Sequence, residues 1–376
     1  MKGSIGEWIA AFLDPKNRMQ YVGVDGAISS LSPVISGVPQ GTVLGPVLFL
    51  IHIVRICQGI SDDSSSSSFA DDTKVWRGVK SVEDCAALQN DLKAVYDAAE
   101  HINMIFNSSK FEWLRYSPSN IEPPDAQYMA PDSTVIEQKT SLKDLGVKLS
   151  SDLTFTLQVE KVVATANQVA GWGLRTFRSR SRRLVLQLLK SLVQPHLDYC
   201  SQLWCPSAQN LINKLEGVQK SLISRISDAE LRGKTYWEKL EHLNLFSQER
   251  RRERYMILFI WKLSQGLISG YNIPFNYNSR TGRWAIPASS ASNGTPSNIR
   301  HAKENSLRIK GCRLFNLLPA VLRNANHGDL LMFKNNLDHY LSSIPDQPTV
   351  PGLVRAAETN SLLHQVPMSN SWAPIL

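Results

Sequence analysis

The chain has 376 residues, of which 43% are apolar and 20% charged, and its formal net charge is +8. These values are typical of a globular protein with two or three domains, and the charge favours a polyanionic partner, although on charge alone a basic protein that binds no nucleic acid is the better interpretation. The longest apolar run, residues 43–56, is too short and too interrupted to cross a membrane. No apolar signal sequence follows Met1, and five irregularly spaced cysteines argue against a disulfide framework. We therefore expect an intracellular protein.

The first part of the chain predicts a short helix, a hairpin and a second helix. Residues 8–13 have the pattern of an amphipathic helix, and residues 19–24 alternate toward an Asp-Gly dipeptide at 25–26, which is typical of a two-residue hairpin turn. A returning strand is expected at residues 32–35. From residue 42 onward the sequence predicts a helix, because the proline at position 46 fits a first turn.

A turn flanked by glycines lies between that strand and that helix. It consists of Ser36, Gly37, Val38, Pro39, Gln40 and Gly41. The glycines allow the backbone to lie close against a base or sugar, the proline limits its flexibility, and the Gln40 amide can both donate and accept hydrogen bonds. The turn is therefore a candidate nucleotide-binding element; by itself it fits a structural strand-to-helix turn better.

Two adjacent aspartates are the second candidate site. Residues 61–68, rich in serine, are expected to be a flexible loop, and residues 69–76 a hairpin with Asp71 and Asp72 at its tip. Carboxylate oxygens are the ligands that magnesium prefers, and two-metal nucleotidyl transfer uses such ligands to activate a hydroxyl and steady a leaving pyrophosphate. An Asp-Asp dipeptide alone is weak evidence, because residues 62 and 63 form another one, which we interpret as a solvated loop.

A long helix and two short strands are predicted next. Ser81 and Asp84 have the spacing of a capping box, and apolar residues follow at helical spacing as far as residue 106. Strands are predicted at residues 110–116 and 145–149, separated by a proline-rich connection.

Beyond about residue 154 the chain is predicted to be almost wholly helical. Apolar stripes at helical spacing occupy residues 155–169, 184–193, 211–226 and 255–263. Residues 266–300 have the composition of a long loop, a last helix is predicted from a cap at Asp329, and the segment after residue 345 is expected to be disordered.

Two runs of arginine stand out in this helical region. The first lies between two predicted helices without a nearby acid, so it is predicted to contact nucleic-acid phosphates; its members are Arg175, Arg178, Arg180, Arg182 and Arg183. The second run, Arg250, Arg251 and Arg252 with Arg254, is flanked by Glu249 and Glu253, and we interpret it as a solvated helix face with i,i+4 pairs.

In their order along the chain these motifs resemble reverse transcriptases, especially those of LINE-type (jockey-like, non-LTR) retrotransposons. The resemblance is carried by SGVPQGTVLGPVLFLI at 36–51, FADDTK at 69–74, FNSSK at 106–110 and DLGV at 144–147, and it continues through the helical region to about residue 344. It implies RNA-directed DNA polymerase activity by two-metal nucleotidyl transfer with Mg²⁺ or Mn²⁺. The implied partners are an RNA template, a DNA primer and deoxynucleoside triphosphates, in the nucleus or a cytoplasmic ribonucleoprotein.

The expected fold is α+β. A partial polymerase palm, with a small antiparallel sheet plus helices, is expected at residues 1–150, followed by an all-helical thumb-like domain. The thumb-like domain is expected at residues 151–265. A loop is expected at 266–300, a helical C-terminal module at 301–345 and a disordered tail at 346–376.

The resemblance also implies roles for single residues. Asp71 would bind the catalytic metals, with Asp72 as its acidic neighbour. Lys110 would lie near the triphosphate, where a cation can neutralise charge or protonate pyrophosphate; a surface lysine at a strand start is the open alternative. The residues implied to contact template or nucleotide are Ser36, Gly37, Pro39, Gln40, Gly41, Phe69 and Ala70.

The chain departs from the family pattern in two places. The pattern includes an upstream palm motif with a metal-binding aspartate, which neither Asp14 nor Asp25 replaces, and fingers that hold template and nucleotide. Residues 52–56 also differ from the family's segment at that point. We therefore expect an N-terminally truncated chain that is catalytically inactive by itself. The alternatives are a non-catalytic nucleic-acid-binding remnant and a pseudogene product without function.

Overall fold

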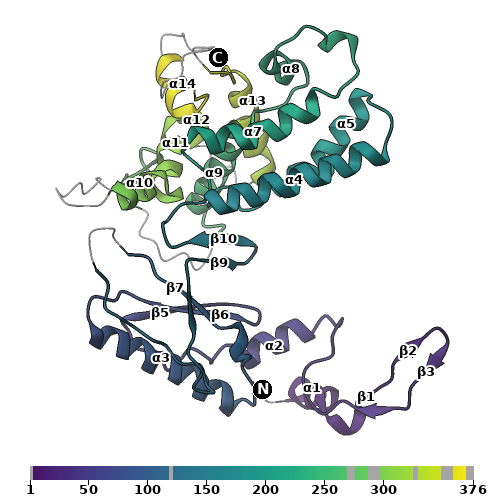
Figure 1. Ribbon diagram of the computed structural model, residues 1–376, viewed down its shortest axis with the longest axis vertical. Coiled ribbons are helices and arrows are strands. Elements are labelled where there is room, and N and C mark those ends of the chain that lie inside the picture. Colours follow the sequence, from purple (N-terminus) through teal and green to yellow (C-terminus); the bar gives the residue numbers. More distant parts are fainter. Residues whose placement is uncertain are drawn as a thin grey trace. The chain divides into compact units, whose positions relative to one another are not determined.

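The computed structural model describes residues 3–117, 122–268, 276–286, 297–324, 329–348 and 359–369. These residues form helices and short two-stranded antiparallel sheets, so the predicted α+β class is confirmed (Figure 1). The chain divides into two compact units: unit 1 comprises Met1–Glu112 and Pro123–Glu137, and unit 2 comprises Trp113–Glu122 and Gln138–Leu376. Among the described helices, none is both long and apolar enough to cross a membrane.

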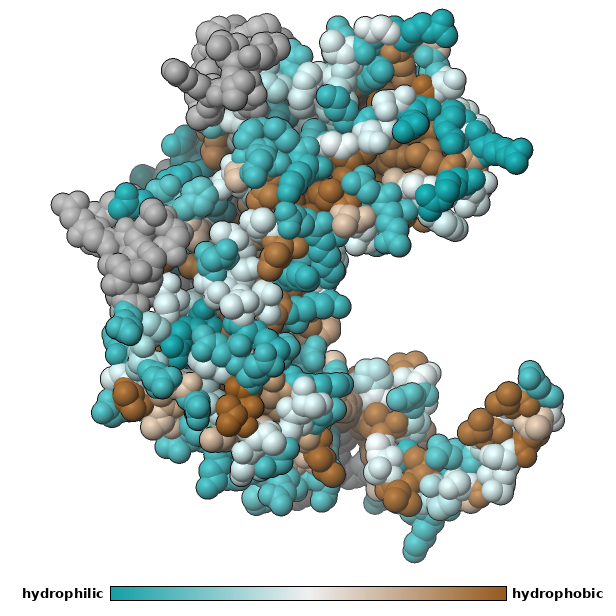
Figure 2. All heavy atoms as spheres, viewed as in Figure 1, coloured by the Kyte–Doolittle hydropathy of each residue, from teal (hydrophilic) through white to brown (hydrophobic). Residues whose placement is uncertain are grey.

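Unit 1 begins with a helix and two small ribbons. These elements are α1 (Ser4–Leu13), β1 (Met19–Gln20) paired with β4 (Ser32–Pro33), and β2 (Gly23–Val24) paired with β3 (Ala27–Ile28). Asp25 and Gly26 turn the β2–β3 ribbon with φ of 50° and 85°. Positive φ at both residues is what a type I′ turn requires, so the predicted hairpin is confirmed. Hydrophobic side chains cover this ribbon (Figure 2), and Val24 and Ile28 are more than half exposed.

The rest of unit 1 is organised around a long helix. Its elements are α2 (Gly45–Ile53), β5 (Ser64–Phe69), β6 (Asp72–Arg77) and α3 (Val82–His101). Ile53 at the end of α2, Val75 of β6, and Val95 and Ala99 of α3 pack in one hydrophobic core. The predicted capping box is present at the start of α3, where the Ser81 side chain and the side chain at position 84 each accept from the other's backbone.

The serine run is a strand, contrary to the expected flexible loop. β5 pairs with β6 in antiparallel register from Ser64 opposite Arg77 to Phe69 opposite Asp72. Ser64 is buried, and its hydroxyl donates to Oδ2 of Asp91 at 2.5 Å. The strand is thus held by backbone pairing and by a carboxylate on α3, neither of which the serine-rich composition reveals.

Short strands connect this region to the helical one. They are β7 (Glu112–Leu114) paired with β8 (Glu137–Lys139), and β9 (Ser141–Asp144) paired with β10 (Val147–Ser150). The first predicted strand is therefore shorter than expected, and Lys110 instead ends a 3-10 turn, Ser108–Lys110. Val147 lies in a core of unit 2, which places residues 138–150 with the helices and not in a domain that ends at 150.

Unit 2 is mainly helical, as predicted. Its elements after β10 are α4 (Thr156–Thr176), α5 (Arg182–Leu188), the π-helical turn η3 (Leu189–Val193), α6 (Gln194–Asp198), α7 (Gln209–Ile223), η4 (Ala229–Leu231), α8 (Tyr236–His242), α9 (Gln248–Ser264), β11 (Tyr277–Asn278), β12 (Arg283–Trp284), α10 (Ser297–Asn305), η5 (Leu307–Gly311), α11 (Cys312–Leu317), α12 (Ala320–Arg323), α13 (Leu330–Ser342) and α14 (Leu362–Ser369). One core lies among α4, α5 and α7, and another among α9, α11 and α13. The helices on either side of the predicted 266–300 loop therefore share a core. The β11–β12 ribbon lies within that loop's range, and α10 begins in it.

α14 differs from the expected disordered tail. Leu362 and Val366 are buried in the core around α9, and Ser361 and Leu362 donate from their hydroxyl and backbone N–H to the Glu253 carboxylate. Other parts of the predicted tail and of the predicted 266–300 loop lie outside the described residues.

The arginine run of α9 is buried, contrary to the predicted solvated face. Arg250 and Arg252 are 0% and 1% exposed. Arg250 donates to the carbonyl oxygens of Leu341 at 3.2 Å and Pro345 at 2.9 Å, and Asp346 lies 3.9 Å away. Arg250 thus binds the chain that leaves α13 to α9, because a buried guanidinium requires acceptors. Among the described residues the guanidinium of Arg252 has no hydrogen-bond partner.

Candidate functional site

The hairpin tip presents two carboxylates. Phe69 and Asp72 are the last paired residues of β5 and β6, so Ala70 and Asp71 form a two-residue loop. Ala70 has φ 53°, a conformation that glycine usually supplies at this place in a tight hairpin. Asp71 lies in the loop and Asp72 at the start of β6, and both are exposed. The predicted placement of the two aspartates is confirmed.

The other end of the hairpin is anchored on α3. Arg77, the last residue of β6, donates to the hydroxyl of Ser61 at 2.9 Å and lies 3.7 Å from carboxylate oxygens of both Asp84 and Asp91. Burial alone would raise the pKa of Asp91, but hydrogen bonds from Ser64 and Ser61, together with Arg77, outweigh it and hold that pKa below its ordinary value. The sequence reasoning missed this anchor. Its one signal is that two acids of α3 stand seven residues apart, on one helix face.

The turn at residues 36–41 is fixed to the start of α2. Thr42 donates from its hydroxyl to the carbonyl oxygen of Pro39 at 2.8 Å and accepts from the backbone N–H of Gly45 at 3.1 Å. A Cβ at Gly45 would lie 2.7 Å from that same carbonyl oxygen, so only glycine allows this approach. The guanidinium of Arg18 donates to the carbonyl oxygen of Gly37 at 2.8 Å. Gly37 has φ 76°, in the left-handed region that favours glycine.

Several residues of this turn face solvent. Ser36, Gly37, Gln40 and Gly41 are exposed, whereas Pro39 is half-buried. The Gln40 amide is thus presented beside exposed backbone at the entry to α2. This arrangement is compatible with contact to a base or sugar, and it equally forms the structural strand-to-helix connection that the sequence favoured for the turn by itself.

Lys110 is held next to an aromatic cluster. Tyr96 of α3, Phe106 and Phe111 lie with ring centroids 5.5 to 5.8 Å apart. Burial raises the pKa of Tyr96 to about 12, and its hydroxyl donates to the carbonyl oxygen of Met129 at 3.2 Å. Lys110 itself is exposed at the end of its 3-10 turn.

The three candidate segments share a supporting core without direct bonds between them. The core of unit 1 contains Phe49 of α2, Val75 of β6 and Phe106 near Lys110. Within the described ranges, no hydrogen bond or ion pair joins the 36–41 turn, Lys110 and the two aspartates. The core therefore fixes the elements that carry them but does not assemble a bonded constellation.

The two aspartates match magnesium in ligand type. Exposed carboxylate oxygens suit a hard cation that keeps several waters and takes further ligands from phosphates. In the part of the chain that the structure describes, no group of three or more His, Cys, Asp or Glu side chains could hold a metal ion. Asp71 and Asp72 thus present two exposed carboxylates, and the metal site remains a prediction.

The first arginine cluster separates into two kinds of residue. Arg180 donates to the carbonyl oxygens of Leu174 at 2.7 Å and Ser179 at 2.9 Å at the end of α4. Arg182 donates to the carbonyl oxygen of His242 at 3.1 Å and lies 3.9 Å from Glu230. The prediction that no acid lies near the cluster is therefore wrong for Arg182, and both side chains are used in folding. The exposed members of the cluster are Arg175, Arg178 and Arg183.

A family model and the similar proteins found by comparison all name RNA-dependent DNA polymerases. Residues 2–149 match the family model described as reverse transcriptase (RNA-dependent DNA polymerase). The chain is 28% identical over 231 residues to the RNA-directed DNA polymerase from mobile element jockey of Drosophila melanogaster, covering 59% of this chain and 25% of that protein. It is 26% identical over 222 residues to the probable RNA-directed DNA polymerase from transposon X-element of the same species, covering 57% and 24%. The chain thus spans about a quarter of the length of these curated relatives, and no solved structure matches it.

Proposed function

From its reverse transcriptase sequence of the jockey-like, non-LTR retrotransposon type, we propose that this chain is part of an RNA-directed DNA polymerase. Asp71 and Asp72 belong to its two-metal nucleotidyl-transfer site. The observation that supports this assignment is the hairpin tip, where both carboxylates are exposed at the end of an anchored ribbon. Unit 1 then contributes part of the palm, and the first helices of unit 2 have the role of a thumb.

Reverse transcriptases generally use a divalent metal. Such an ion, held by Asp71 and Asp72, would supply charge neutralisation for the attack of a primer hydroxyl and the departure of pyrophosphate. The exposed Gln40 amide and the backbone of the 36–41 turn would contact template or incoming deoxynucleoside triphosphate, since both are polar and open to solvent. Lys110 is exposed and cationic, as a residue that stabilises triphosphate charge must be.

Metal binding by the hairpin can be tested directly. Mn²⁺ titration should broaden NMR signals of the β5–β6 tip in the full chain, and Asp71→Asn with Asp72→Asn should remove that broadening. The control is a pair of other exposed aspartates of unit 1, Asp62→Asn with Asp97→Asn, which should leave it unchanged. Equal loss with both pairs, or no broadening at the tip, would overturn the assignment.

The 376 residues alone are further proposed to lack polymerase activity. The support is that the described part of the chain gathers no third metal-ligating side chain beside the two aspartates. In a primer-extension assay on poly(A)–oligo(dT) with Mg²⁺ or Mn²⁺, the chain should extend no more primer than its Asp71→Asn variant. Robust extension that this substitution abolishes would contradict the proposed inactivity and support the catalytic role of Asp71.

A second candidate function is nucleic-acid binding without catalysis. It is favoured by the exposed guanidinium groups of Arg175, Arg178 and Arg183 at the junction of α4 and α5, which can neutralise phosphates and release counterions. RNA or DNA binding should then persist in Asp71→Asn and weaken in Arg178→Gln. Binding that is lost with Asp71→Asn and insensitive to Arg178→Gln would contradict it.

A further inference from the structure

A second basic segment, distant in the sequence, lies against the α4–α5 arginines. The backbone N–H of Ser227 donates to the carbonyl oxygen of Arg180 at 2.8 Å. Arg182 reaches Glu230 at 3.9 Å and the carbonyl oxygen of His242 at 3.1 Å. The residues that follow α7 are therefore bound to the loop between α4 and α5, at one end of unit 2.

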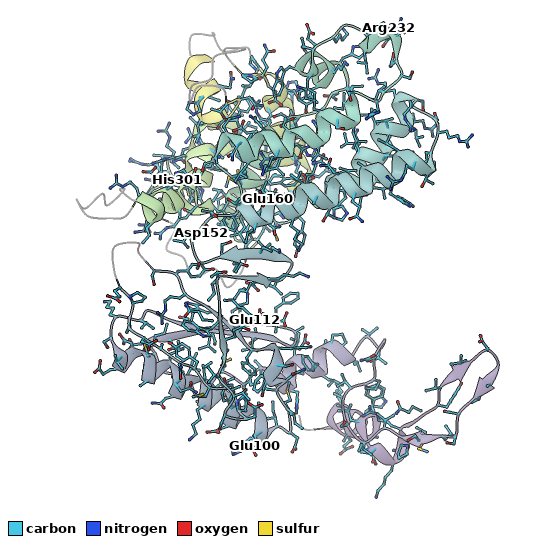
Figure 3. The ribbon with its side chains drawn as sticks, in the orientation of Figure 1. Glu100, Glu112, Asp152, Glu160, Arg232 and His301 are labelled. Atoms are coloured by element: carbon cyan, nitrogen blue, oxygen red, sulfur yellow. The ribbon has the colours of Figure 1, made fainter. Side chains whose placement is uncertain are left out.

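This second segment adds exposed cations to that end. Arg225, Arg232 and Lys234 are all exposed, and each lies two to four residues from Ser227 or Glu230, which make the bonds to the loop. In Figure 3, Arg232 lies at the end of unit 2 that carries the α7–α8 connection, and Figure 2 shows hydrophilic side chains projecting around this end.

The acids of the same segment are already engaged. Asp228 accepts from the backbone N–H of Glu230 at 3.0 Å and so caps η4. Glu230 lies 3.0 Å from His242 and 3.9 Å from Arg182. Glu238 at the start of α8 is a third acid of this end, and hydrogen bonds from Thr235 together with the charge of Lys234 lower the pKa of its carboxyl group. The exposed cations of the two segments outnumber these three acids; they are Arg175, Arg178, Arg183, Arg225, Arg232 and Lys234.

Arg180 and Arg182 have a different role from the exposed cations. Arg180 satisfies carbonyl oxygens at the end of α4, and Arg182 joins the loop to the residues around α8. They are positioning residues, which hold the two basic segments in one geometry before any ligand arrives. Segments whose backbones are already held together lose less freedom on binding than segments that move independently.

We propose that these two segments form one phosphate-binding face that takes the phosphodiester backbone of a nucleic acid. This rests on the nucleic-acid binding proposed above, and it adds the second segment and the division of roles. The cations of this face are Arg175, Arg178, Arg183, Arg225, Arg232 and Lys234. Side chains of both segments contact phosphates, so the face binds without reading base sequence.

A matched control lies elsewhere on unit 2. Lys143 on β9, Arg280 after β11 and Lys303 on α10 are also exposed. The β9–β10 hairpin packs near the first turns of α4, where Lys161 donates to the carbonyl oxygen of Gly146 at 3.3 Å. Lys161 and Arg175 stand 14 residues apart on α4, which at about 1.5 Å per residue is about 21 Å along the helix.

The experiment is a salt titration of binding by the full chain. A labelled DNA duplex and a labelled single-stranded RNA are the two probes, read by fluorescence anisotropy. Replacing Arg225, Arg232 and Lys234 together by Gln should flatten the plot of log affinity against log salt by about 2 to 3. Replacing Lys143, Arg280 and Lys303 by Gln removes the same charge and should leave the slope unchanged. The probe that shows the larger change identifies duplex or single strand as the ligand.

Two results would overturn the inference, and they can be told apart. If the unmodified chain binds both probes and the two triple variants have the same salt slope as each other, the second segment is not part of the face, while nucleic-acid binding stands. If the unmodified chain binds neither probe, nucleic-acid binding itself fails. Circular dichroism melting of each variant separates lost contact from lost folding, because substitution of exposed residues should leave the melting temperature unchanged.

Discussion

Arg77 and Asp91 form a buried ion pair that joins the β5–β6 hairpin to α3. Nη1 of Arg77 lies 3.7 Å from Oδ2 of Asp91, and the two side chains are 9% and 6% exposed. From Arg77 to Asp72 the strand rises about 17 Å, at about 3.3 to 3.4 Å per residue. The two candidate metal ligands therefore lie at the free end of a ribbon whose other end is fixed by charge.

We expect Asp91→Ala to destabilise unit 1 by about 2–4 kcal/mol, because it leaves three hydrogen-bond donors without their acceptor and removes an ion-pair partner of the buried Arg77 guanidinium. Those donors are the backbone N–H and the hydroxyl of Ser61 and the hydroxyl of Ser64. Urea unfolding measures the loss, and hydrogen exchange should show faster exchange in β5 and β6. Asp97→Ala, at an exposed position of the same helix, is the control. Equal stability of the two variants would contradict the anchor.

The local parts of this region could be predicted from the sequence. The capping box of Ser81 and Asp84 and the turn at Asp25 and Gly26 depend on residues one to three positions apart, so short-range patterns reveal them. The tip position of Asp71 and Asp72 follows from the same kind of pattern, an apolar lead-in followed by a strand.

The anchoring contacts could not be predicted in this way. Ser64 meets its carboxylate partner 27 residues later in the chain, and Arg250 meets carbonyl oxygens 91 to 110 residues later. A serine run without a visible partner has the composition of a loop, and arginines flanked by glutamates have that of a solvated helix. Both interpretations were wrong because the partners are supplied by the tertiary fold.

We expect Gly45→Ala to disturb the 36–41 turn. Alanine is ordinarily favourable in a helix, but here its Cβ would lie 2.7 Å from the backbone carbonyl oxygen of Pro39, which cannot move as a flexible side chain would. Overpacking of this kind costs roughly 1–3 kcal/mol. Urea unfolding gives the cost, and amide exchange around residues 37–45 should accelerate. Gly78→Ala, where a Cβ meets nothing within 4 Å, should have little effect; a similar loss in both variants would contradict the steric explanation.

α14 is expected to contribute to the stability of unit 2. Leu362 is 2% exposed in the core around α9, so Leu362→Ala should cost about 2–4 kcal/mol by removing buried methyl groups and leaving a cavity. The neighbouring exposed residue provides the control, His364→Ala. Thermal unfolding checks both. A melting temperature of Leu362→Ala that equals that of the control would show that the helix does not stabilise the core.

The stability of unit 2 should fall as the pH rises from about 5 to about 8. Burial raises the pKa of Glu216 to about 7, although its hydrogen bond from Tyr236 and the charge of Arg252 act in the opposite direction and the charge of Asp346 adds to the rise. A carboxyl group whose pKa is raised on folding binds its proton more tightly in the folded state. Its contribution is therefore fully present below the unfolded pKa, near 4.5, and is lost as the pH rises through the folded pKa, near 7.

Glu216→Gln should remove this part of the pH dependence. Glutamine can still accept the hydrogen bond that the backbone N–H of Gln248 gives at 2.8 Å, but it does not titrate. At about 1.36 kcal/mol per pKa unit the effect amounts to about 3 kcal/mol between the two ends of the range. Melting temperatures measured across that range should decline less steeply for Glu216→Gln than for the unmodified chain. Glu241→Gln, at an exposed position on α8, should retain the original decline, and parallel curves for all three proteins would exclude Glu216 as its source.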